Sequence, residues 1–179
     1  MFDFLPARSS IMMLKSLTET DADKLVGKIV VIGSYANGVY HFRMSLVDVD
    51  ANKSVRLDMF PSYMDLSDPA LGTMIIERRQ DAAYSDEHVT VPFQATLTQA
   101  ASVRTILMLL FSDNARDKYR FNNEGQGCRH WCATLVGDLE QAGLLSSGAV
   151  HAFEQWEIEQ EAALGTTAFP MPRIRGQFY

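Results

Sequence analysis

The order of residue patterns predicts an α+β fold in which helices pack on an antiparallel sheet. Strand-like patterns occupy residues 28–96, and helix-like patterns occupy residues 97–165. A chain that forms its strands first and its helices afterwards typically builds this arrangement. The 179 residues, 47% of them hydrophobic, suffice for a single domain with a buried core. We therefore expect one domain over residues 1–179, with an N-terminal extension at 1–27 and an extended tail at 166–179.

Within the N-terminal extension, residues 18–27 resemble a short helix or a capped turn. Five later segments show strand patterns: 28–35, 39–49, 54–60, 72–80 and 88–95. An Asn-Gly pair at 37–38 predicts a tight hairpin between the first two of these, and the polar run at 50–53 predicts a turn between the second and the third. In the second segment, Tyr40 and Phe42 share one face while His41 and Arg43 share the other, because side chains alternate along a strand.

Three segments of the second half are predicted to be helical: 98–114, 127–145 and 146–163. The second has an apolar stripe that includes Cys128, Trp131 and Cys132. Either Ser146 or Ser147 could cap the third helix, because a serine hydroxyl accepts a hydrogen bond from the first turn. Two further prolines after residue 166 indicate an extended tail, whose final aromatic residues could pack back on the domain.

The composition excludes several classes of function. The formal net charge of −6 argues against a nucleic-acid-binding surface, which needs a basic patch. The longest strongly apolar run, residues 106–111, is far shorter than the roughly 20 residues of a membrane span. The N-terminus lacks the basic start and apolar core of a secretory signal. With only two cysteines and no disulfide framework, we expect a cytoplasmic protein with reduced thiols.

The residues around Cys128 are typical of an activated thiol. Cys128 opens the predicted second helix directly after a loop that contains Gly125 and Gly127. Unpaired N–H groups and the helix dipole at this end favour the thiolate, which is the nucleophilic form. The same N–H groups could stabilise an oxyanion, and Gly127 would let a substrate approach closely. Gln126 could donate to that oxyanion or could be a plain loop residue.

A thiol nucleophile needs a base, and His41 is the candidate on the polar face of its strand. Asp58 lies on the next strand, 54–60. It shares the face of His41 if the numbers of paired residues in the two strands add up to an odd number, and it could then orient the imidazole. Two alternatives remain open: His41 as a half-buried strand residue, and Asp58 in a surface salt bridge with Arg43 or Arg56. His130 points away from both thiols on the helix, so we expect it to bond to neighbouring backbone and expect no metal site.

The run "GCRHWC" around Cys128 resembles the N-C-x-H-F/W signature of permuted papain-like thiol enzymes, such as lecithin:retinol acyltransferase-like proteins and PPPDE peptidases. "YHFRMSLVD" is similar to the early strand that carries their histidine. The resemblance implies a circularly permuted papain-like core, with Cys128 as nucleophile, His41 as base and a structural His130. Gly127 stands where those enzymes usually have asparagine. Most of residues 38–179 also resembles a mostly fungal family of small proteins of unknown function.

The function expected from these residues is thiol-dependent acyl chemistry, which is hydrolysis or transfer at an amide, ester or thioester. The catalytic residues would be Cys128, His41 and Asp58, with Gln126 and Gly127 near the oxyanion. The substrate would be a small molecule or a peptide, with no metal and no organic cofactor. Two alternatives are a non-catalytic binding protein on the same fold and a small cyclase or isomerase of specialised metabolism.

Overall fold

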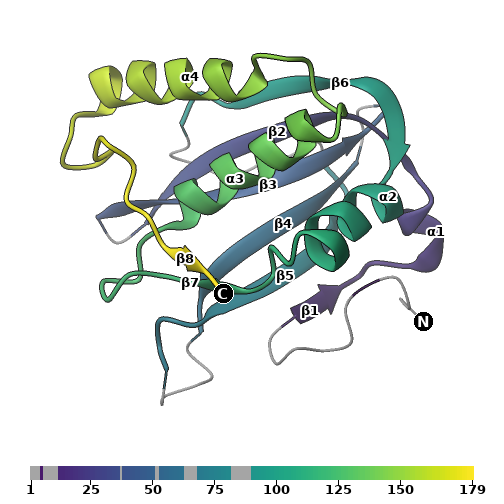
Figure 1. Ribbon diagram of the computed structural model, residues 1–179, viewed down its shortest axis with the longest axis horizontal. Helices are drawn as coiled ribbons and strands as arrows, with labels where there is room; N and C mark the ends of the chain where they lie inside the picture. Colours follow the sequence, from purple (N-terminus) through teal and green to yellow (C-terminus); the bar gives the residue numbers. More distant parts are fainter. Residues whose placement is uncertain (1–4, 6–11, 37, 51–52, 63–67, 82–89) are drawn as a thin grey trace.

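A mixed, mostly antiparallel six-stranded sheet carries the helices in the computed structural model of the chain (Figure 1). The structure describes residues 5, 12–36, 38–50, 53–62, 68–81 and 90–179. The strands are β1 (Met12–Lys15), β2 (Leu25–Ala36), β3 (Val39–Asp48), β4 (Ser54–Pro61), β5 (Gly72–Arg79) and β6 (Phe93–Ser102). They lie in the order β1-β5-β4-β3-β2-β6, and only the β1–β5 pairing within this sheet is parallel. The predicted α+β class is confirmed.

Most predicted strands form close to their expected bounds. The β2–β3 hairpin closes with Ala36 opposite Val39, as the Asn-Gly pair predicts. Gly38 takes a φ of +88°, a conformation that glycine adopts without strain. The β3–β4 connection also forms, although residues 51–52 of its predicted turn lie outside the described residues. The extension before β2 contributes β1 to the sheet and a short helix, α1 (Glu19–Ala22), which Thr18 caps.

The predicted helix over residues 98–114 is wrong in its first part. Residues up to Ser102 belong to β6, which pairs with β2, and helix α2 (Val103–Leu107) starts only after them. A π-helical stretch, η1 (Met108–Asp113), follows directly. The buried residues of β6, Phe93, Leu97 and Ala101, are spaced by four, a pattern that suits one face of either a helix or a strand. This segment is a strand because it pairs with the edge of β2. The first residues of the predicted 88–95 strand lie outside the described residues.

Helix α3 (Cys128–Gln141) lies across the sheet, and α4 (Ala149–Leu164) packs against α3 and β6 (Figure 1). The N-cap of α4 is Gly148 rather than Ser146 or Ser147, with a φ of +98° that favours glycine. In the part of the chain that is described, no helix is long and apolar enough to span a membrane.

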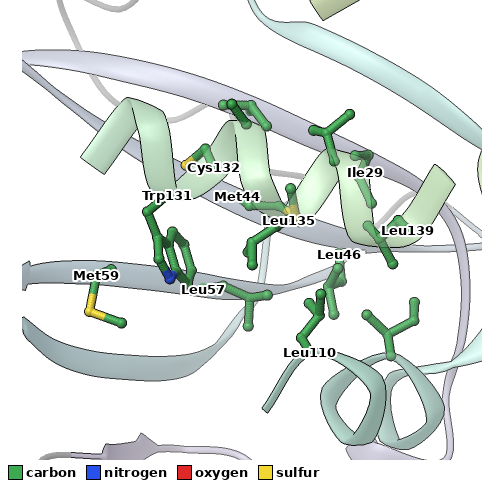
Figure 2. Close-up of a cluster of buried hydrophobic side chains, with 14 of the residues drawn as sticks. Ile29, Met44, Leu46, Leu57, Met59, Leu110, Trp131, Cys132, Leu135 and Leu139 are labelled. Carbon is green, nitrogen blue, oxygen red and sulfur yellow. The ribbon is translucent and has the colours of Figure 1, made fainter. Parts of the chain in front are cut away.

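The core lies between α3 and the central strands, as Figure 2 shows. The fully buried stripe of α3 contains Trp131, Cys132, Leu135 and Leu139. It packs on inward-facing apolar residues of the sheet, which include Ile29, Met44, Leu46, Leu57 and Met59. The indole N–H of Trp131 donates to the Arg116 carbonyl at 2.7 Å, so its one polar group is satisfied. This packing fixes the N-terminus of α3 over β3 and β4.

The C-terminal tail returns to the domain. Its last strand, β8 (Gln177–Phe178), pairs with β7 (Tyr119–Arg120), a short strand of the segment that leads to α3. The ring of Phe178 lies 4.7 Å from that of Tyr119, centroid to centroid. The tail thereby passes beside the N-terminus of α3.

Candidate active site

The N-terminus of α3 has a tight backbone at Gly127, directly before Cys128. Gly127 has a φ of +139°, and a Cβ placed there would lie 2.7 Å from the Tyr119 hydroxyl oxygen and 3.0 Å from the Gly176 nitrogen. The Tyr119 hydroxyl donates to the Gly127 carbonyl at 2.8 Å and accepts from the Gly176 N–H at 2.9 Å. A side chain at this position would meet these atoms and take up a strained φ, so the position favours glycine.

The sulfur of Cys128 lies where β3 separates from β4. The Phe42 N–H donates to Cys128 Sγ at 3.3 Å. Opposite Phe42 in β2, the Gly33 N–H donates to the Thr90 hydroxyl at 3.0 Å and its carbonyl accepts the Thr90 N–H at 2.8 Å, so this pair does not bond across β2 and β3. The Phe42 N–H therefore points toward β4, beyond the β3–β4 pairing at residues 44–47. The sulfur takes the place of a β4 carbonyl as its acceptor.

His41 and Asp58 lie together on one face of the sheet. Met44 pairs with Leu57, so the numbers of paired residues in β3 and β4 add up to an odd number. This is the condition under which His41 and Asp58 share a face. The distance between His41 Nε2 and Asp58 Oδ1 is 2.6 Å, with 29% and 15% of the two side chains exposed. The bond to Asp58 occupies Nε2, which leaves Nδ1 as the ring nitrogen for Cys128. A surface salt bridge is thus not the main contact of Asp58.

These three side chains share one hydrogen-bonded system, and their charges are coupled. Burial lowers the pKa of His41, but hydrogen bonds to Asp58 and Cys128 and their negative charges outweigh it and raise that pKa to about 10. Burial raises the pKa of the Cys128 thiol, but the hydrogen bond and charge of His41 and the N–H groups of Phe42 and Arg129 bring it below its ordinary value. The arrangement favours a thiolate and an imidazolium.

The pKa values of Asp58 and Cys132 are shifted in opposite directions. Burial raises the pKa of Asp58, but the hydrogen bond from His41 and the charges of His41, Arg43 and Arg56 lower it overall, so Asp58 stays ionised. The pKa of Cys132 is raised well above its ordinary value by complete burial and by the charge of Cys128. Of the two thiols, only Cys128 therefore lies in surroundings that favour the thiolate.

Cys128 and His41 line a pocket of about 110 Å³, together with both residues expected near the oxyanion, Gln126 and Gly127. Asn122 holds this loop, since its Oδ1 accepts the Gln126 N–H at 2.7 Å. A larger hollow of about 760 Å³ also borders His41, and both polar residues such as Asp58 and apolar residues such as Phe60 line it. The structure thus brings all five predicted site residues to one region, with His41 bordering both spaces.

A buried ionic cluster beside the site was not found from the sequence. Arg129 Nε lies 3.1 Å from Oε1 of Glu157, which is fully buried, and Arg173 Nη2 lies 2.6 Å from Glu157 Oε2. The Arg129 guanidinium also stacks over Phe169, 3.9 Å from the ring centroid. One signal could have suggested this cluster: Glu157 directly follows Trp156 on the apolar stripe of the third predicted helix.

The other described histidines, His130 and His151, lie apart from this chemistry. His130 Nδ1 lies 3.2 Å from the Tyr119 hydroxyl, so its contact is a side chain and not the neighbouring backbone that we expected. His151 is exposed on α4, and His88 lies outside the described residues. Among the described residues, no three His, Cys, Asp or Glu side chains are grouped so that they could hold a metal ion.

Residues 31–179 match the protein family described as "Domain of unknown function (DUF7770)". No curated protein and no solved structure matches the chain. Every residue that lines the pocket, from Val39 to Ile174, lies inside the matched range.

Proposed function

The chain belongs to the DUF7770 family, and we propose for it thiol-dependent acyl chemistry, which is hydrolysis or transfer at an amide, ester or thioester. The observation that carries this proposal is the 2.6 Å contact of His41 with Asp58 beside a sulfur that accepts the Phe42 N–H. A nucleophile, a base and a group that orients the base are the parts such chemistry needs. The substrate would be a small molecule or a peptide.

In the proposed reaction, the Cys128 thiolate attacks the carbonyl carbon and forms a tetrahedral oxyanion. The N–H of Cys128 lies in the first turn of α3, where no helical carbonyl accepts it, and it can stabilise that oxyanion. As the bond to the leaving group breaks, the His41 imidazolium gives its proton to that group. Water or another acceptor then loses a proton to His41 and attacks the thioester, and the Cys128 thiolate leaves.

The order of the site residues along the chain supports a circularly permuted papain-like core. The strand with His41 comes first, the strand with Asp58 follows, and the helix that Cys128 opens comes last. Permuted papain-like enzymes have this order of histidine and cysteine. In this proposal Asp58 is the third catalytic member, which the sequence motifs alone left open.

Hydrolysis of p-nitrophenyl acetate, followed with an intact-mass measurement of the protein, tests the proposal. We expect release of p-nitrophenol and a transient acetyl adduct on Cys128. Cys128→Ala should abolish both, while Cys132→Ala, the matched control one turn along α3, should keep both. Equal turnover in wild type and Cys128→Ala would contradict the proposal.

The burial of Cys128, of which only 8% is exposed, favours a second candidate function. In this alternative, the protein binds a ligand in the same pocket without turning it over. A Cys128→Ala variant would then bind that ligand as well as the wild type, and no acyl adduct would form with any ester or thioester.

A further inference from the structure

We propose that the pocket beside Cys128 accepts a short apolar acyl group, and that the C-terminal tail sets the length of that group. This inference rests on the proposed acyl chemistry and adds the class of substrate. Three observations support it: the residues that line the pocket, the volume of the pocket, and the contacts that hold the tail in place.

The lining of the pocket is mainly apolar. The strand β3 and the tail provide its apolar residues, which are Val39, Tyr40, Phe42, Ala168, Pro170 and Ile174. Arg129 also borders the pocket, but its guanidinium donates to the Pro170 carbonyl and forms an ion pair with Glu157. The Arg129 guanidinium is therefore already bound to protein groups, and the mainly apolar lining makes an apolar group the better occupant.

The volume limits the size of the occupant. At about 110 Å³, the pocket is smaller than a cavity of about 150 Å³ that holds benzene. An acyl chain of about four or five carbons fits this space. A long fatty acyl chain would extend beyond it.

The tail forms a fixed wall of the pocket because two of its residues, Phe169 and Arg173, are held in place directly beside the residues that line the pocket. Phe169 is fully buried, and its ring meets that of Phe42 edge-on at 5.6 Å between centroids. Its neighbours Ala168 and Pro170 line the pocket. Ile174, a further wall residue of the tail, follows Arg173, which binds the buried Glu157.

The apolar pocket and the larger hollow, which both border His41, hold different parts of the substrate. With the acyl group in the apolar pocket, the leaving group extends past His41 into the larger hollow, whose lining combines apolar residues such as Phe60 with the ion pair of Asp68 and Arg120. His41 then lies between the two parts and can protonate the leaving group. The step forms the bond from Cys128 Sγ to the acyl carbon, breaks the bond to the leaving group, and moves the imidazolium proton to that group.

A series of N-acetylcysteamine thioesters with acetyl, butyryl, isovaleryl, hexanoyl and decanoyl groups tests the inference. The readouts are the rate of acylation of Cys128, by intact mass, and the release of N-acetylcysteamine. We expect butyryl and isovaleryl groups to react at least about tenfold faster than decanoyl, the scale on which pockets discriminate by size. Alkylation by iodoacetamide, measured in parallel, reports thiol reactivity without an acyl group.

Variants of the wall move the length limit in opposite directions. Ile174→Ala should admit hexanoyl and decanoyl groups, whereas Ala168→Leu should slow butyryl and leave acetyl nearly unchanged. The matched control is Ile158→Ala, on the exposed surface of α4, which should keep the wild-type preference. Equal rates for all chain lengths, in wild type and variants, overturn this inference but leave acyl chemistry at Cys128 intact. No acylation by any thioester, with rapid alkylation of Cys128, overturns both.

Discussion

Replacing His41 with alanine separates a catalytic pair from mere packing. The change removes the imidazolium that bonds to both Asp58 and Cys128. The Cys128 thiol then keeps its burial, which raises its pKa, and retains only the N–H groups of Phe42 and Arg129 as stabilising contacts. We therefore expect the pKa of Cys128 to rise and the thiolate to disappear at neutral pH.

The size of this effect follows from the protonation of His41. Its pKa of about 10, against an ordinary 6.5, corresponds to about 5 kcal/mol in favour of the imidazolium at 1.4 kcal/mol per unit. Asp58 and Cys128 share this preference. If a sizeable share belongs to Cys128, the thiolate loses on the order of 1–2 kcal/mol, which lowers its population by roughly tenfold.

Ultraviolet absorbance of the thiolate against pH measures this change, with Cys128→Ala as the blank. The urea midpoint of each protein, measured in parallel, reports stability. We expect the free energy of unfolding to fall as well near neutral pH, because the change removes a stabilised imidazolium and leaves Asp58 without its cationic partner. A thiol that titrates as in the wild type, in a variant that has lost stability, would refute the reasoning and leave His41 as a packed strand residue.

Three further changes test parts of the site. Iodoacetamide should label Cys128 much faster than Cys132 near neutral pH, and equal slow labelling in the native protein would remove the nucleophile argument. Asp58→Asn should slow that labelling of Cys128 by about fivefold or more, because the base loses its anionic partner; an unchanged rate would show that the carboxylate does not act through the histidine. Gly127→Ala should lower the free energy of unfolding by about 1–3 kcal/mol, while Gly137→Ala, inside the same helix with only ordinary contacts at 3.8 Å, should raise it slightly; similar midpoints for the two variants in urea would contradict the described backbone.

Much of the site could be predicted because its signals are local. Alternation along β3 placed His41 on the less apolar face, and a polar turn implied that the strand with Asp58 is its neighbour. The helical stripe and the preceding glycine loop located the start of α3 at Cys128. Each of these depends on a few residues of sequence and on the repeat of a strand or a helix.

The remainder depends on contacts between distant segments. The buried spacing of Phe93, Leu97 and Ala101 suits a helix as well as a strand, and only pairing with β2 decides between them. The wall of the pocket could not be predicted for the same reason. It exists because Arg129 and Glu157, from different helices, meet under the tail.

The protonation of the His41 ring tests the central claim most directly. Nitrogen NMR of protein labelled at histidine, recorded at about pH 8, distinguishes imidazolium from neutral imidazole because an ordinary histidine is neutral there. A thiolate–imidazolium pair held by Asp58 predicts protons on both ring nitrogens of His41, and the loss of one of them in Asp58→Asn. A neutral His41 ring at this pH in the wild type, beside a protonated Cys128, would contradict the account.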